Sequence, residues 1–143
     1  MDLERIVAQL MADEGFSPVA FWDNDQYSYG FGCKAPGPSA VISYKEAVSL
    51  LEERAEQSIR EYQDIFRDAA VEITEVRAEA LVNMLYNLGR TKFMKFRRML
   101  HFLDKGNWMQ AAYEAQDSLW FKQTGNRAKR IVRQLATGKR EDS

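Results

Sequence analysis

The chain has 143 residues, the length of a single domain, and 45% of them are apolar, which is enough to form a buried core. Its 20 Lys and Arg nearly balance its 21 Asp and Glu, so a uniformly basic nucleic-acid-binding protein is excluded. One cysteine, Cys33, and one histidine, His101, exclude an internal disulfide framework and every multi-histidine metal site.

The N-terminal segment predicts a helix followed by a β-hairpin. Apolar residues recur at helical spacing over residues 3–11, and Gly15 is the type of residue that ends a helix. Two short aromatic runs, at residues 20–22 and 27–29, then flank four polar residues, which is the pattern of two strands joined by a turn. We expect a loop over residues 34–39 and no further β-structure after it.

The rest of the chain predicts helices. A capping box at Ser43 begins a long helix, about residues 43–68. Further helices follow over about residues 74–143, and one of them is expected to span residues 93–105. We therefore predict an α+β, mostly helical protein in which a connecting helix joins a small helix-plus-hairpin lobe, residues 1–42, to a helical lobe.

Charge is distributed unevenly along the chain. Residues 1–75 carry 15 Asp and Glu against 6 Lys and Arg, whereas residues 76–143 carry 6 against 14. One interpretation is an acidic lobe that bears the chemistry beside a basic lobe that attracts an anionic polymer. Chance segregation of charges on solvated surfaces explains the same pattern, and both interpretations stay open.

Two carboxyl groups in the N-terminal segment are candidates for acid–base chemistry. Glu14 falls at the end of the predicted helix, where unpaired carbonyl groups disfavour an ionised carboxylate, so it suits the role of a general acid. Asp23 begins the predicted turn, where a carboxylate is hydrated and ionised. Such residues are also common on protein surfaces, and their spacing alone does not decide between the two interpretations.

The same segment resembles the active-site segment of phage-type lysozymes. In that family a Glu, eight residues and an Asp are followed by a Thr shortly before a Gly-x-Gly run. Here Glu14 and Asp23 have that spacing, and Ser28 is the hydroxyl residue, one position early. The resemblance returns in residues 80–89 and, most specifically, in residues 120–130. The chain is identified as a member of the phage-type lysozymes (endolysins, glycoside hydrolase family 24), which implies a lysozyme-like fold.

The resemblance implies hydrolysis of the β-1,4 bond between N-acetylmuramic acid and N-acetylglucosamine in peptidoglycan, without a metal or cofactor. Glu14 would protonate the leaving oxygen, and Asp23 with Ser28 would hold a water on the opposite face of the sugar, which is the inverting arrangement. A one-residue shift turns a strand side chain to the other face of the sheet. Asp25 therefore stays an alternative to Asp23 for positioning the water.

Five further site residues follow from the resemblance alone. Arg127 matches an arginine that lies beside the catalytic glutamate, and Tyr86 and Asn87 match a wall of the substrate cleft. Lys34 and Glu114 fall where the family binds substrate, although their residue types differ. A core aromatic and a polar helix end are the alternative interpretations of Tyr86 and Asn87.

The expected partner is the glycan strand of peptidoglycan, with no nucleic acid and no stable membrane insertion, and the protein is expected to be a monomer. The sequence shows no signal-peptide pattern, so we expect synthesis in the host cytoplasm and action on the cell wall after holin-dependent release or delivery with a virion. Two alternatives stay open. One is a lytic transglycosylase, which needs Glu14 but not Asp23, and the other is a non-catalytic wall-binding or phage structural relative.

Overall fold

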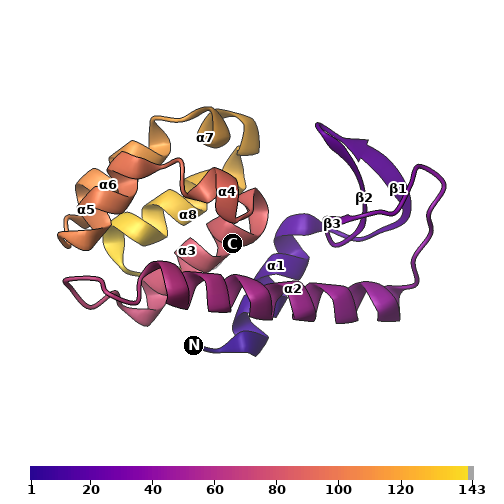
Figure 1. The fold of residues 1–143 in the computed structure, drawn as a ribbon, viewed down its shortest axis with the longest axis horizontal. Coiled ribbons are helices and arrows are strands. Elements are labelled where there is room, and N and C mark those ends of the chain that lie inside the picture. The colour runs from indigo at the N-terminus through magenta and orange to yellow at the C-terminus, as the bar shows by residue number, and fades with distance from the viewer. Residues whose placement is uncertain (142–143) are drawn as a thin grey trace. The chain divides into compact units, whose positions relative to one another are not determined.

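The computed structural model describes residues 1–141 and consists of helices with one small antiparallel sheet (Figure 1). The predicted α+β, mostly helical fold is confirmed. The chain forms two compact units: Asp2–Gln57, and the described residues from Ser58 onward together with Met1. Within residues 1–141, no helix has the length and apolar character needed to cross a membrane.

Helix α1 (Leu3–Glu14) follows the predicted N-terminal helix. The Asp2 carboxylate accepts a hydrogen bond from the backbone N–H of Arg5 at 3.2 Å and thereby caps the first turn. Gly15 ends the helix with a φ of 67°, a conformation that glycine adopts without steric cost. The helix therefore stops directly after Glu14 and leaves this side chain in its last turn.

The sheet contains three strands in the order β1 (Ser17–Asp23), β2 (Gln26–Gly30) and β3 (Cys33–Lys34). Strands β1 and β2 form the predicted hairpin. The sequence does not predict β3, because two residues are too few to show the alternation of polar and apolar side chains that marks a strand. An isolated bridge between Val19 and Val41 adds a further contact to β1.

Helix α2 (Tyr44–Ile65) has 22 residues and contributes to both units. Its capping box is formed as expected: the Ser43 hydroxyl accepts a hydrogen bond from the backbone N–H of Glu46 at 3.1 Å, and the Glu46 carboxylate accepts one from the backbone N–H of Ser43 at 3.4 Å. Three of its apolar side chains are fully buried in the first unit: Ala47, Leu51 and Ala55.

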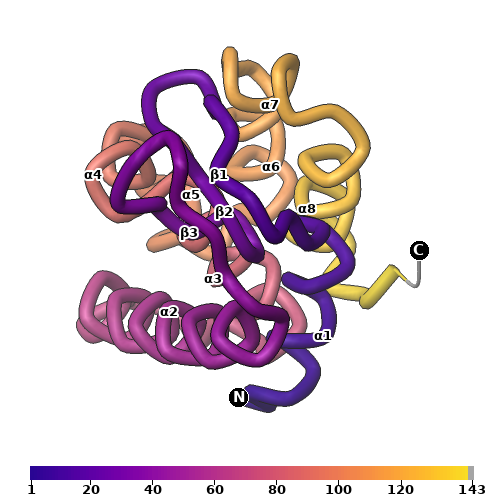
Figure 2. Tube along the Cα trace, turned by 90° about the vertical axis from the view of Figure 1, so that its right-hand side faces the viewer, coloured from indigo at the N-terminus to yellow at the C-terminus, as the bar shows by residue number. Residues whose placement is uncertain are grey.

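The second unit is helical over its described residues. Its remaining helices are α3 (Glu75–Leu88), α4 (Arg90–Phe93), α5 (Arg97–Asp104), α6 (Trp108–Gln116), α7 (Leu119–Thr124) and α8 (Asn126–Thr137). Helix α6 packs against α5 and α8, and α8 also packs against α3 (Figure 2). The single helix predicted over residues 93–105 is wrong, since α4 and α5 are separate. Phe96, with a ψ of 59°, interrupts the helical conformation between them.

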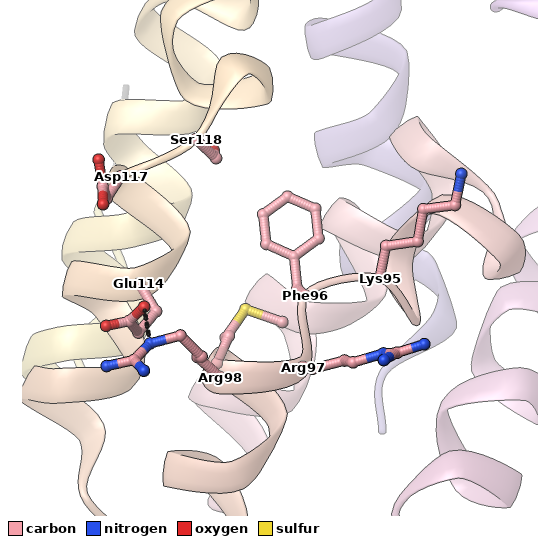
Figure 3. A pocket seen from close by; sticks show the side chains of 8 residues that line it. Lys95, Phe96, Arg97, Arg98, Glu114, Asp117 and Ser118 are labelled. Atoms are coloured by element: carbon pink, nitrogen blue, oxygen red, sulfur yellow. Dashed lines mark hydrogen bonds and ion pairs between the residues drawn. The ribbon is translucent and has the colours of Figure 1, made fainter.

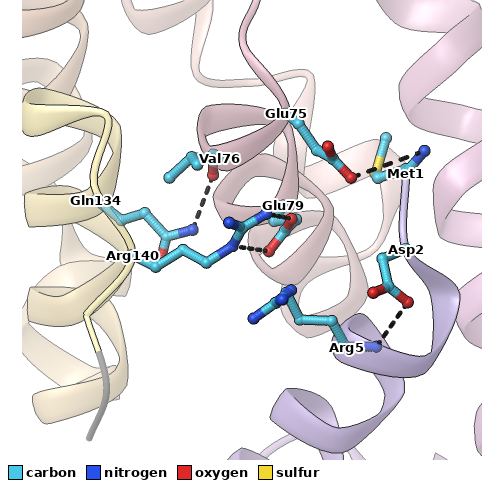
Figure 4. A network of polar contacts seen from close by, with 8 residues as sticks. All are labelled: Met1, Asp2, Arg5, Glu75, Val76, Glu79, Gln134 and Arg140. Atoms are coloured by element: carbon cyan, nitrogen blue, oxygen red, sulfur yellow. Dashed lines mark hydrogen bonds and ion pairs between the residues drawn. The ribbon is translucent and has the colours of Figure 1, made fainter.

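A polar network joins α8 and the residues that follow it to α3 (Figure 4). Arg140 donates two hydrogen bonds to the Glu79 carboxylate, from Nε at 3.1 Å and from Nη2 at 2.6 Å. Gln134 donates to the carbonyl oxygen of Val76 at 2.8 Å. Because the Glu79 side chain is only 8% exposed, these hydrogen bonds from Arg140 replace contacts with water that burial removes.

Burial of the Tyr62 phenol in α2 is expected to make the protein less stable at alkaline pH. Its ring centroid lies 5.0 Å from that of Phe66, and burial raises the pKa of Tyr62 to about 12. An unfolded chain releases the same proton near pH 10. The resulting stabilisation is therefore complete below about pH 10 and is lost as the pH rises through 12. We expect the free energy of unfolding in urea to fall over this range, and to fall less steeply in Tyr62→Phe. If the free energy of unfolding fell equally steeply with pH in the wild type and in Tyr62→Phe, this expectation would be contradicted.

Candidate active site

Three polar side chains share one face of the hairpin. Asp23 pairs with Gln26 across β1 and β2, and Ser28 lies two residues further along β2. Directly paired residues share a face, and residues two apart along a strand also share a face. Asp23, Gln26 and Ser28 are therefore neighbours, although they are spread over both strands.

Hydrogen bonds connect these three side chains in a row. The Ser28 hydroxyl donates to Oδ2 of Asp23 at 3.3 Å and accepts from Nε2 of Gln26 at 3.2 Å. Ser28 is fully buried, whereas Asp23 is exposed. The arrangement thus holds a solvent-accessible carboxylate in a fixed orientation by means of a buried hydroxyl, which suits a group that must position a water molecule.

The short turn between β1 and β2 accounts for this register. Asn24 adopts a φ of 59°, and the backbone N–H of Asp25 donates to the carbonyl oxygen of Asp23 at 2.6 Å. This turn keeps Ser28 on the same face as Asp23, despite the one-residue shift noted in the sequence. Asp25 itself lies exposed in the turn.

The carboxyl group of Glu14 lies directly against the backbone of Gly32. A Cβ atom built on Gly32 would be 2.5 Å from Oε1 of Glu14 and 2.9 Å from its Cδ. Any side chain at this position would collide with the carboxyl group. Glu14 is half-buried, so it is partly withdrawn from water, and it belongs to the same compact unit as Asp23 and Ser28.

Two carboxyl groups in different surroundings therefore belong to one unit. Glu14, at the end of a helix and against a glycine, is the more buried of the two, and Asp23 is the more exposed. Such a pair can divide the work of a general acid and a general base. Within the described residues, no cluster of His, Cys, Asp or Glu is suited to bind a metal ion.

The remaining candidates have the following surroundings. Lys34 in β3 is exposed and pairs with Ser28 across β2 and β3. Arg127, Tyr86 and Asn87 belong to the second unit. Arg127 donates from Nε to the side-chain oxygen of Asn83 at 3.0 Å.

The surroundings of Tyr86 and Asn87 bear on their two interpretations. Tyr86 is only 1% exposed, which favours its interpretation as a core aromatic. The side-chain oxygen of Asn87 accepts a hydrogen bond from the Trp120 indole at 2.7 Å, so this oxygen already has a hydrogen-bond partner within the unit. A role of either residue in binding substrate stays a prediction.

Glu114 lies at a pocket of the second unit with a volume of about 310 Å³. The pocket is lined by Lys95, Phe96, Arg97, Arg98, Met99, Glu114, Asp117 and Ser118 (Figure 3). The Glu114 carboxylate accepts hydrogen bonds from Nε of Arg98 at 2.8 Å and from the Gln110 amide at 3.3 Å. Glu114 is therefore held in place on one side of the pocket by two neighbours.

Two residues of the site are absent from the sequence prediction. Gln26 could have been found, because it lies two residues before Ser28 and residues two apart in a strand share a face. Gly32 belongs to the Gly-x-Gly run, but its contact with Glu14 depends on how the turn folds back onto α1, which no local pattern encodes.

Comparison with known proteins identifies several relatives. The family model described as phage lysozyme matches residues 11–140. The pre-baseplate central spike protein Gp5 of Enterobacteria phage T4 is 27% identical over 92% of this chain and 28% of its own length. The probable T4-type lysozymes 1 and 2 of Dictyostelium discoideum are 30% and 28% identical, over 46% and 68% of this chain and 39% and 58% of their own lengths. The chain thus spans less than two thirds of the length of each of these relatives.

Proposed function

The chain belongs to the phage lysozyme family, and on this premise we propose that it hydrolyses the β-1,4 glycosidic bond between N-acetylmuramic acid and N-acetylglucosamine in peptidoglycan. The observation that carries the proposal is the hydrogen bond from Ser28 to Asp23, in the same unit as Glu14. A carboxylate fixed by a hydroxyl and a second, more buried carboxyl group are the two parts that such a reaction needs.

In the proposed reaction, Glu14 donates its proton to the glycosidic oxygen as the bond to the anomeric carbon breaks. Asp23 accepts a proton from a water molecule, and the oxygen of this water forms the new bond to the anomeric carbon. Ser28 fixes the orientation of Asp23 and leaves its second carboxylate oxygen available to the water. An inverting reaction of this kind needs about 6.5–9.5 Å between the two carboxyl groups, so that the water fits between Asp23 and the sugar.

Product analysis on purified peptidoglycan tests this proposal. We expect the wild type to release reducing sugar ends, and Glu14→Gln and Asp23→Ala each to lower the rate by about 10²- to 10⁴-fold, the usual contribution of one acid–base group. Asp25→Ala is the matched control, because it removes another exposed carboxylate of the same turn, and it should retain activity.

Other outcomes of the same experiment identify the alternatives. Anhydro-sugar products that persist in Asp23→Ala would show a lytic transglycosylase, which closes the sugar on itself without water. A loss in Asp25→Ala with full activity in Asp23→Ala would transfer the water-positioning role to Asp25. The absence of any product from the wild type would refute hydrolysis and favour a non-catalytic wall-binding protein.

As its biological role we propose an endolysin that degrades the host cell wall after release from the cytoplasm. The similarity to Gp5 supports a second candidate, a lysozyme module that a phage particle carries, because the match includes 92% of this chain but only 28% of Gp5. An antibody against this chain would distinguish the two roles. Signal in purified particles would support the particle-borne module, and signal only in the soluble lysate would support the endolysin.

A further inference from the structure

Arg54 contacts the backbone segment against which Glu14 lies. From the middle of α2, its Nη1 donates a hydrogen bond to the carbonyl oxygen of Gly32 at 2.8 Å, in a partly buried position. Gly32 is also the residue whose added Cβ would collide with the Glu14 carboxyl group. Gly32 is therefore a neighbour of both Arg54 and Glu14, the proposed general acid.

The turn that contains Gly32 is intrinsically deformable. Gly30 has a φ of 62° and Gly32 a φ of 74°, so two of three consecutive residues adopt a conformation that favours glycine. Glycine has the greatest backbone freedom of all residues, and fixing it in one conformation costs the most entropy. Strand β3, which follows the turn, is only two residues long and adds little pairing. A contact from outside the sheet therefore adds to what holds the turn in one conformation.

Helix α2 can supply such a contact because it is anchored beside Arg54. Leu51 and Ala55, three residues before and one after it, are both fully buried. The planar guanidinium group of an arginine presents its N–H groups in a fixed geometry, which directs a hydrogen bond more strictly than a lysine ammonium does. The position of the Gly32 carbonyl group is thus tied to a rigid element.

We propose that Arg54 is a positioning residue for the hydrolytic reaction. It fixes the Gly32 backbone, and this backbone in turn fixes the carboxyl group of Glu14 that must reach the glycosidic oxygen. The inference rests on the proposed function above and extends it to a residue outside the sheet. Arg54 acts through Gly32 and is not itself required to touch the substrate.

Steady-state kinetics on soluble, uncross-linked peptidoglycan fragments test the role of Arg54. We expect Arg54→Met to lower kcat about 10- to 100-fold per folded molecule with KM nearly unchanged, because a displacement of about 1 Å at a reacting group has an effect of this size. Arg54→Lys should recover part of the loss, since an ammonium group can still donate to the carbonyl oxygen. Arg60→Met removes an exposed arginine of the same helix and should behave as the wild type.

A second measurement does not depend on catalysis. In Arg54→Met, the amide protons of β3, next to the Gly32 turn, should exchange with solvent at least about tenfold faster than in the wild type or in Arg60→Met, because the turn opens more readily. Unfolding in urea gives the folded fraction against which kcat is corrected.

The outcomes are distinguishable from a failure of the proposed function. Unchanged kcat in Arg54→Met would overturn the positioning role, as would a loss that matches the loss of folded protein and is not rescued by Arg54→Lys. Wild-type protein that produces no reducing ends would refute the hydrolysis itself. In that case unchanged exchange of the β3 amides in Arg54→Met would refute the fixation of the Gly32 turn as well, whereas faster exchange would retain it.

Discussion

Gly32→Ala is expected to lower the rate of peptidoglycan hydrolysis about 100-fold while the protein still folds. The new Cβ would lie 2.5 Å from Oε1 of Glu14, so the carboxyl group must move by about 1 Å or more. The obstructing atom is the far end of a flexible side chain, so the collision is relieved by a rotation of Glu14. The backbone contribution to the cost of folding is about 1–2 kcal/mol for an alanine at a positive φ.

Gly89→Ala is the control for adding a Cβ atom to a glycine with a positive φ. Gly89 has a φ of 81°, similar to the 74° of Gly32, but nothing lies within 4 Å of its added Cβ. Unfolding in urea gives the folded fraction of each variant, and only Gly32→Ala should lose hydrolysis per folded molecule. Equal activity in the two variants would mean that the contact between Gly32 and Glu14 has no part in the reaction.

The types of the elements were more predictable than their boundaries, but some boundaries could be predicted because they depend on one or two residues. Gly15 ends α1 and the capping box at Ser43 begins α2, each by a dihedral angle or hydrogen bonds within a few residues. The division between α4 and α5 was not predictable. The apolar spacing continues through Phe96, so no local pattern marks the non-helical angle of this residue.

The sequence predicts Glu14, Asp23 and Ser28 as members of the candidate site, but it does not predict how they are arranged. The spacing of Glu14 and Asp23 identifies two carboxyl groups, but the face on which Ser28 lies depends on the register of the hairpin. That register follows from a turn in which Asn24 adopts a positive φ, and the sequence permits more than one such turn. The contribution of Arg54 is less predictable still, because 22 residues separate it from Gly32 and no local pattern relates the two.

The ion pair between Glu79 and Arg140 is expected to contribute strongly to the stability of the second unit. Glu79 lies on a buried stretch of α3, and its side chain is 8% exposed against 36% for Arg140. In Arg140→Met the buried carboxyl group of Glu79 loses both hydrogen bonds from this partner. We expect the free energy of unfolding in urea to fall by about 2–4 kcal/mol, somewhat below the usual cost of breaking a buried pair, because Arg140 is partly exposed to water.

The pair between Arg133 and Glu141 is the matched control, because it joins the same kinds of groups at a more exposed position. Its side chains are 56% and 34% exposed, so Arg133→Met should cost at most about 1 kcal/mol. Equal losses in the two arginine variants would contradict the assignment of the stability to burial of Glu79.

The loss of stability in Arg140→Met has two possible causes: a buried charge without a partner, and the loss of two hydrogen bonds. The double variant Glu79→Leu/Arg140→Met distinguishes them. Removing both charges also removes the desolvation penalty of Glu79, so most of the loss seen in Arg140→Met should be recovered, to within about 1 kcal/mol of the wild type. Full recovery would mean that Arg140 mainly provides a partner for the buried charge of Glu79, and that the ion pair itself adds little to the free energy of unfolding. A double variant as unstable as Arg140→Met would instead mean that the two hydrogen bonds themselves hold the chain after α8 against α3.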